Sequence, residues 1–110
     1  MDFNQYQSLA SRTMTQDETM PPVLHVLNYT LGLVGEAGET ADLIKKFAFH
    51  GHEIDHEKLE KELGDVLWYV SALATIFGYS LTEVAEINIE KLMKRYPEGF
   101  KTEDSVNREE

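Results

Sequence analysis

The chain has 110 residues, 42% of them hydrophobic, which is enough to fold as one domain with a modest core. Twenty acidic residues against ten basic ones give a net charge of −10, which disfavours nucleic acid and anionic membranes as partners. Because there is no cysteine, a disulfide framework and a thiol nucleophile are excluded. The sequence has no apolar run of membrane-spanning length and its first residues do not resemble a signal peptide, so we expect a soluble, cytoplasmic protein.

Apolar residues recur at the spacing of helices, and no segment has a convincing strand pattern. We therefore predict an all-α fold, a bundle of about four helices. A capping box of Asp2 and Gln5 marks the start of the first helix, and one of Ser80 and Glu83 marks the start of the last. The helices are expected over residues 2–14, 23–49, 57–77 and from 81 to 95 or 96.

The chain is expected to form one domain over residues 1–100. Pro97 and Gly99 stop the last helix, and the segment 101–110 that follows holds a single aliphatic residue, Val106. Such a segment lacks the apolar side chains that it needs to pack, so we expect it to be disordered.

Two pairs of acids, Glu36 with Glu39 and Glu62 with Asp65, stand three residues apart within segments that are otherwise apolar. On a helix, residues at this spacing lie on one face, and here that face is shared with apolar side chains. A carboxylate on a buried face has to be protonated, paired with a cation or bound to a metal. Four carboxylates on two helices favour a site for a hard cation such as Mg²⁺, which prefers oxygen ligands and also binds phosphate.

The helix expected over residues 23–49 is apolar on two faces. One face carries Leu33 beside the first acid pair, and the opposite face carries Leu27, Leu31 and Val34. A helix that is apolar all round has to be buried all round, and a lone chain of 110 residues can barely supply the cover. We therefore predict a homo-oligomer that assembles through this helix.

The last helix supplies positive charge. Asn88, Lys91 and Arg95 fall on one of its faces, and Lys58 stands one turn before Glu62 in the preceding helix. A metal held by carboxylates on one wall and Lys or Arg side chains on another wall provide the charge neutralisation that phosphoryl transfer requires. These cations are therefore predicted to bind phosphate.

Each of these features also has a purely structural explanation. A single Glu-x-x-Glu pair is typical of a solvated helix face, and Lys91 and Arg95 also suit the C-terminus of a helix. For Trp68 and Tyr69, packing is favoured over stacking against a substrate. The three histidines within residues 50–56 indicate an exposed polar loop more than a transition-metal site. The presence of two acid pairs on apolar faces is what favours the metal site.

The spacing of the two acid pairs resembles a known signature. Glu-x-x-Glu, an interval of 22 residues and Glu-x-x-Asp look like the E-x-x-E…E-x-x-D pattern of the MazG-like nucleotide pyrophosphohydrolases. The neighbouring residues agree, and a later Lys-x-x-x-Arg-Tyr-Pro is similar to the basic element of that family. The resemblance covers about residues 24–100. It is carried by Glu36, Glu39, Glu62, Asp65, Lys91, Arg95, Tyr96 and Pro97.

The resemblance implies an all-α enzyme, dimeric or tetrameric, that uses Mg²⁺, or Mn²⁺ in its place, to cleave a nucleoside triphosphate between the α and β phosphates. The substrate is a ribonucleotide or a deoxynucleotide, and the products are the monophosphate and pyrophosphate. The implied metal ligands are Glu36, Glu39, Glu62 and Asp65, of which Glu39 also orients or deprotonates the attacking water. The implied catalytic residues are Glu39, Lys58, Lys91 and Arg95, and the implied substrate-binding residues are Lys58, Asn88, Lys91, Arg95 and Tyr96.

Two other functions stay open as alternatives. The phosphoribosyl-ATP pyrophosphohydrolases share the helical, acid-rich pattern. A catalytically silent bundle that binds a nucleotide or a partner protein is the second alternative, although retention of all four acids and of the basic face argues against it. A di-iron carboxylate bundle is disfavoured because its Glu-x-x-His pairs are absent from these helices.

Overall fold

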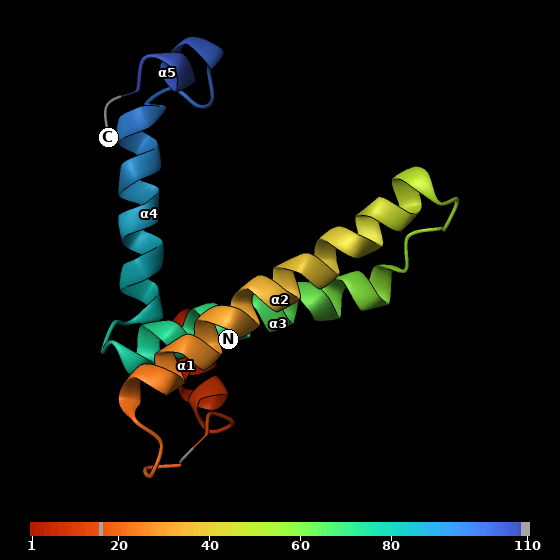
Figure 1. The fold of residues 1–110 in the computed structure, drawn as a ribbon. Coiled ribbons are helices and arrows are strands. Elements are labelled where there is room, and N and C mark those ends of the chain that lie inside the picture. The colour runs from red at the N-terminus through yellow and green to blue at the C-terminus, as the bar shows by residue number, and fades with distance from the viewer. Residues whose placement is uncertain (16, 109–110) are drawn as a thin grey trace.

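The structure is a computed structural model that describes residues 1–15 and 17–108. The described residues are all-helical, which confirms the predicted fold class (Figure 1). The first helix ends earlier than predicted, and a fifth, short helix follows the four expected ones. The helices are α1 (Phe3–Ser11), α2 (Pro22–Phe49), α3 (His56–Ile76), α4 (Leu81–Arg95) and α5 (Thr102–Val106).

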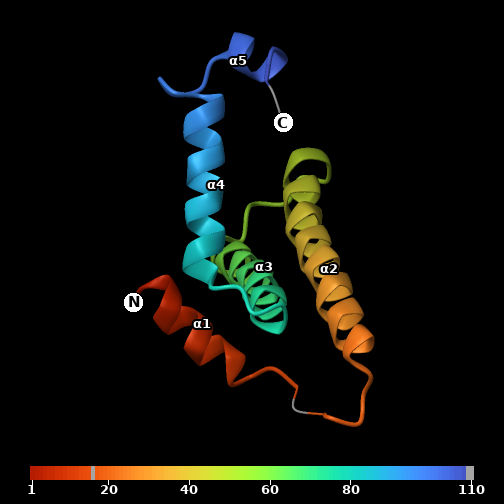
Figure 2. The ribbon, with the colours of Figure 1, turned by 90° about the vertical axis from the view of Figure 1, so that its left-hand side faces the viewer.

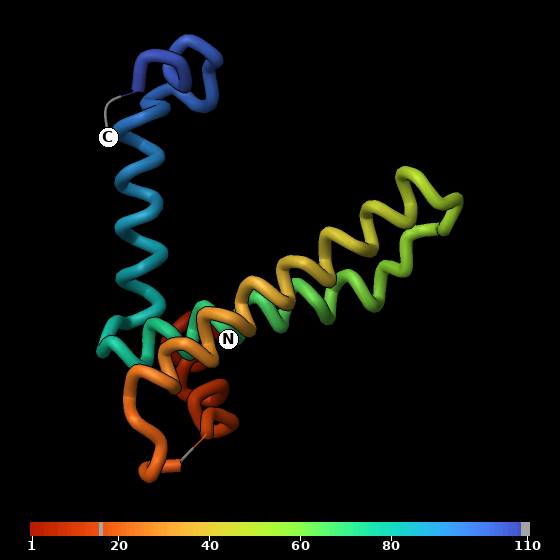
Figure 3. Tube along the Cα trace, in the orientation of Figure 1, coloured from red at the N-terminus to blue at the C-terminus, as the bar shows by residue number. Residues whose placement is uncertain are grey.

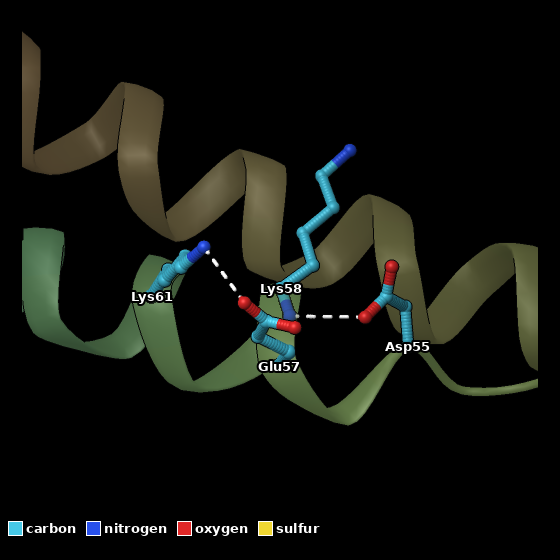
Figure 4. Close-up of polar contacts among 4 residues, drawn as sticks. All are labelled: Asp55, Glu57, Lys58 and Lys61. Carbon is cyan, nitrogen blue, oxygen red and sulfur yellow. Dashed lines mark hydrogen bonds and ion pairs between the residues drawn. The ribbon is translucent and has the colours of Figure 1, made fainter.

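Side-chain caps fix where three of the helices begin. The predicted capping box at α1 is present, because the Asp2 carboxylate accepts the Gln5 backbone N–H and the Gln5 side chain accepts the Asp2 N–H, both at 2.8 Å. At α3 the Asp55 carboxylate accepts the Lys58 backbone N–H at 3.1 Å (Figure 4). At α4 the Ser80 hydroxyl accepts a backbone N–H in the same way.

A glycine sets the end of α3. Gly78 has φ +75°, in the left-handed region that side chains with a Cβ disfavour. Its N–H donates to the Thr75 carbonyl at 3.1 Å, and the Tyr79 N–H donates to the Ala74 carbonyl at 2.8 Å. These two bonds form a Schellman motif, which stops α3 and turns the chain into α4.

The helices are arranged around a long hairpin. α2 and α3 run antiparallel along each other and are joined by the loop of residues 50–55 (Figures 1 and 3). α1 packs mainly against α3, and α4 contacts α1 and α3 near the end of the hairpin where α3 stops. The rest of α4 then diverges from the hairpin, so the four long helices are arranged openly within one chain (Figure 1).

This openness leaves the chain with a small core. Its radius of gyration is 17.2 Å, whereas a compact domain of this length has about 13 Å. Its accessible surface is 8399 Å², against roughly 6,200 Å² for a compact monomer of the same mass. Among the described residues, the buried apolar side chains are Tyr29, Ala72, Ala74 and Leu81.

The predicted second apolar face of α2 lies in solvent in this single chain. Leu27, Leu31 and Val34 are 49%, 62% and 65% exposed, respectively. Gly35 and Gly38 are on the same helix, and a Cβ added to either one would meet no described atom within 4 Å. Within the described part of the chain, the face is therefore apolar and uncovered.

Gly32 is different, because it allows a close contact between α2 and α3. A Cβ at this position would lie 2.2 Å from Cε1 of the Tyr69 ring. The Tyr69 ring thus lies directly against the backbone of α2, which only a glycine permits.

We expect Gly32→Ala to destabilise the protein by about 1–3 kcal/mol, because Tyr69 has to leave its position. The gain of about 0.5–1 kcal/mol in helix propensity offsets only part of this cost. Gly35→Ala is the matched control, since it makes the same change in the same helix at an open position. Urea unfolding measures both, and equal stabilities of the two variants would contradict the contact.

The segment expected to be disordered contains α5 in the described residues up to 108. The helical turn is held by local bonds, in which the N–H groups of Ser105 and Asn107 donate to the carbonyls of Lys101 and Glu103. The acids in its first turn suit the positive end of a helix. Backbone hydrogen bonds and the placement of charges therefore form this turn without apolar packing. The prediction of disorder relied on the shortage of apolar side chains in this segment. Residues 109 and 110 lie outside the described residues.

Within the residues that the structure describes, no helix combines the length and the apolar content that crossing a bilayer requires. The three histidines within residues 50–56 are exposed. His50 and His52 lie in the loop, in agreement with a polar loop, whereas His56 is the first residue of α3.

Candidate active site

The antiparallel hairpin brings acids from both predicted pairs together. One carboxylate oxygen each from Glu36 on α2 and from Glu62 and Asp65 on α3 lie within 4.8 Å of one another. Glu62 is only 8% exposed, although its side chain is an ionisable carboxyl. Three of the four predicted metal ligands thus form one cluster in the middle of the α2–α3 contact.

Two oxygens in this cluster have no hydrogen-bond partner among the described residues. They are Oε2 of Glu36 and Oε2 of Glu62, and both are shielded from solvent. A buried carboxylate oxygen without a partner costs free energy unless a cation or a proton satisfies it. Because all the atoms offered as metal ligands are carboxylate oxygens, the cluster fits a hard divalent cation such as Mg²⁺ or Mn²⁺.

Glu39, the fourth predicted ligand, is exposed beside the cluster. The close approach of the Glu62 carboxyl, followed by its charge, raises the pKa of the Glu39 carboxyl, while the charge of Lys58 acts to lower it. The close approach of the Glu36 carboxyl, followed by burial, raises the pKa of the Glu62 carboxyl. The shifts show that the acids repel one another and that Lys58 lies within electrostatic reach of Glu39.

The raised pKa values predict how pH and metal affect stability. A carboxyl whose pKa is higher in the fold than in the unfolded chain, where it is about 4.3, stabilises the fold below that pH. This contribution is lost as the pH rises through the raised pKa of Glu39 and Glu62. We therefore expect Mg²⁺ to raise the melting temperature more at about pH 7.5 than at about pH 5, because the cation relieves the repulsion between ionised acids. Thermal unfolding with and without MgCl₂, with matched NaCl as control, measures this, and equal shifts at both pH values would contradict it.

Lys58 lies in the first turn of α3, at the loop end of the hairpin (Figure 4). Its neighbour Lys61 pairs with Glu57 at 3.0 Å, whereas the Lys58 side chain extends away from Glu57 and Asp55 (Figure 4). The Lys58 ammonium forms no ion pair within residues 1–15 and 17–108, so it is available to an anionic ligand.

The other predicted phosphate-binding residues are not beside the acids in one chain. Lys91 and Arg95 line a groove of about 730 Å³ between α4 and α5, together with Glu103 and Asp104. Asn88 is exposed farther down α4. Figure 2 shows that α4 stands apart from α2 along its upper half. Tyr96 is the C-cap of α4 and packs against Phe100 with ring centroids 5.2 Å apart.

Aromatic side chains form the wall next to the acid cluster. A pocket of about 360 Å³ is lined by Glu36, Asp65, Trp68, Tyr69 and Thr13. Trp68 and Tyr69 do pack, as predicted, with their rings edge to face, but they also border the acids. The spacing from Asp65 to Tyr69 is one helical turn, which is the signal in the sequence that places them there. Thr13 comes from a distant segment, and no local pattern indicated it.

Residues 25–100 match the family model of the MazG nucleotide pyrophosphohydrolase domain. The chain belongs to this family. It is also 40% identical over 74 residues to the Gene 37 protein of Mycobacterium phage L5, an alignment that covers 64% of this chain and 65% of the phage protein. The chain therefore matches just under two thirds of that relative, whose name states no activity. No solved structure is significantly similar to the chain.

Proposed function

We propose that this MazG domain is a nucleoside triphosphate pyrophosphohydrolase, acting in the cytoplasm on a ribo- or deoxynucleotide. It would cleave between the α and β phosphates and release the monophosphate and pyrophosphate. The observation that carries the proposal is the convergence of Glu36, Glu62 and Asp65, with two shielded oxygens that lack a partner among the described residues. Membership of the family supports a hydrolase that acts on nucleotide pyrophosphates.

In this proposal the acid cluster holds one or more Mg²⁺ ions, with Glu39 as an additional ligand. When bound, the metal neutralises the triphosphate and lowers the pKa of a coordinated water. Glu39 is exposed next to Glu62, and its raised pKa makes its carboxylate a stronger base than an unperturbed glutamate. It accepts the proton of the attacking water, or orients that water for in-line attack. Lys58 attracts the phosphates from one turn before Glu62 and balances the charge that develops on them.

We also infer that the functional unit is a homo-oligomer, a dimer or a tetramer. The chain exposes roughly 2,200 Å² more surface than a compact monomer of its mass, which falls within the range that obligate interfaces bury. The open face of Leu27, Leu31 and Val34 supplies an apolar part of that surface. Because Lys91 and Arg95 stand away from the acids of their own chain, a phosphate-binding role for them depends on the acid cluster of a neighbouring copy.

A panel of nucleoside and deoxynucleoside triphosphates, assayed with Mg²⁺, tests the proposed reaction. Pyrophosphate and monophosphate as the only products, formed with Mg²⁺ and not with EDTA, would agree with it. Release of orthophosphate would place cleavage at another bond. Turnover of phosphoribosyl-ATP alone would assign the chain to the alternative pyrophosphohydrolase activity, and binding without any turnover would identify a silent bundle.

A further inference from the structure

One wall of the pocket beside the acid cluster comes from a part of the chain that lies outside the family match. The match begins at residue 25, but Thr13 lines the pocket together with Glu36 and Trp68. Figure 1 shows the red N-terminal segment lying against the hairpin at its lower end. The N-terminal segment therefore contributes to the site, and Trp68 is the side chain that it contacts there.

A chain of two hydrogen bonds connects this segment to the indole. Nε1–H of Trp68 donates to Oγ1 of Thr13 at 2.7 Å, and the Thr13 hydroxyl donates to the Ala10 carbonyl at 2.7 Å. A hydroxyl has only one proton, so its donation to Ala10 fixes Oγ1 as the acceptor for the indole. Thr13 thus holds the ring plane of Trp68 in one orientation.

Two tyrosines support the same ring. Trp68 meets Tyr29 at a centroid distance of 5.8 Å and an interplanar angle of 67°, and it meets Tyr69 at 4.9 Å and 86°. Tyr29 is 2% exposed, and Tyr69 lies against Gly32, so neither support is a mobile surface residue. Trp68 itself is only half-buried, and it borders the pocket that contains Glu36 and Asp65.

We propose that Trp68 is the platform on which the nucleobase of the substrate stacks, and that Thr13 is the residue that positions it. The site combines a rigid aromatic ring, which suits a base, with carboxylates that would hold a metal and so attract phosphates. A base and phosphates are the two parts that a nucleotide presents. Stacking on an indole accepts any base, because every base has a π face. This inference rests on the proposed function, since it assigns the base-binding part of the same site.

The test uses the fluorescence of Trp68, which is the only tryptophan of the chain. A non-hydrolysable α,β-methylene nucleoside triphosphate is added with Mg²⁺ to the full chain, and its binding is measured separately by calorimetry. We expect saturable quenching that follows binding. Inorganic tripolyphosphate, which has the phosphates but no base, should bind without comparable quenching. Equal quenching by both ligands, binding of the analogue without quenching, or no binding of the analogue would overturn the proposal.

Variants separate positioning from general stability. Thr13→Val keeps the shape and removes the acceptor, so KM for the triphosphate should rise about fivefold with kcat within about twofold, and Thr13→Ser should restore KM. Trp68→Leu should raise KM by about tenfold or more. Thr82→Val is the matched control, because the Thr82 hydroxyl bonds Asn4 at 3.0 Å away from the acid pocket. A KM for Thr13→Val that equals the control would contradict the positioning role.

The two proposals fail in different ways. If the nucleotide panel gives no turnover but the analogue still quenches Trp68, the hydrolase assignment fails and the stacking site stands. If pyrophosphate is released normally and Trp68→Leu has an unchanged KM, the stacking site fails and the hydrolase assignment stands.

Discussion

Glu36→Gln is expected to reduce kcat by more than about a hundredfold, while it raises the melting temperature of the metal-free protein. Loss of a residue that merely supports a metal ligand costs about 10–100-fold, and Glu36 is itself a proposed ligand. The same change removes one of the charges that raise the pKa of Glu62, so it relieves repulsion in the absence of metal. The opposite signs of the two effects distinguish a functional acid from a structural one.

The measurement needs both readouts on one sample. Pyrophosphate release with saturating Mg²⁺ gives kcat, and thermal unfolding in EDTA gives the apo melting temperature. Glu60→Gln is the matched control, because it makes the same change of charge on the exposed side of α3. It should alter neither quantity appreciably. Normal turnover by Glu36→Gln would remove the metal site from the centre of the proposed mechanism.

The ends of the long helices could be predicted because their signals are local. Asp2 with Gln5, and Ser80 at the start of α4, bond backbone groups three residues away, so the sequence alone contains both partners. The left-handed turn at Gly78 is likewise encoded by one residue. The helices and their polar caps therefore agree with the prediction to within a few residues.

The convergence of the acids was also predictable, but the residues that form the walls of the pocket beside them were not. Glu36 and Glu62 lie on adjacent antiparallel helices, and the helical period puts each on the apolar side. The bond of Thr13 to Trp68 joins residues 55 positions apart, and no periodicity relates them. The direction of α4 was not predictable either, because it depends on a turn geometry that the pattern of apolar residues does not contain.

The placement of Lys91 and Arg95 shows a different kind of limit. Their spacing identifies one face of α4, yet in a single chain that face meets α5 and not the acids. A sequence pattern indicates which face of a helix is basic or apolar, but it does not indicate whether that face contacts the same chain or a second copy. Helical periodicity therefore does not predict a site that is shared between copies of the chain. Measurement of the oligomeric state tests for such a site here.

Leu31→Glu is expected to dissociate the assembly and to abolish turnover. Leu31 is 62% exposed at the centre of the open face of α2, so a glutamate there is tolerated in an isolated chain. If a second copy covers this face, the new carboxylate is buried without a partner, which costs several kcal/mol per interface. The basic face of α4 from the neighbouring copy would then no longer reach the acid cluster.

Leu9→Glu is the matched control, because Leu9 is 50% exposed but lies on α1, away from the open face of α2. Light scattering should give a multiple of 12.6 kDa for the wild-type chain and for Leu9→Glu, and 12.6 kDa for Leu31→Glu. Circular dichroism checks that the helices persist. The Mg²⁺-dependent rise in melting temperature should also persist in Leu31→Glu, since Glu36, Glu62 and Asp65 belong to one chain. A wild-type protein that is itself monomeric at micromolar concentration, or a Leu31→Glu variant that stays assembled and active, would rule out an interface on this face of α2.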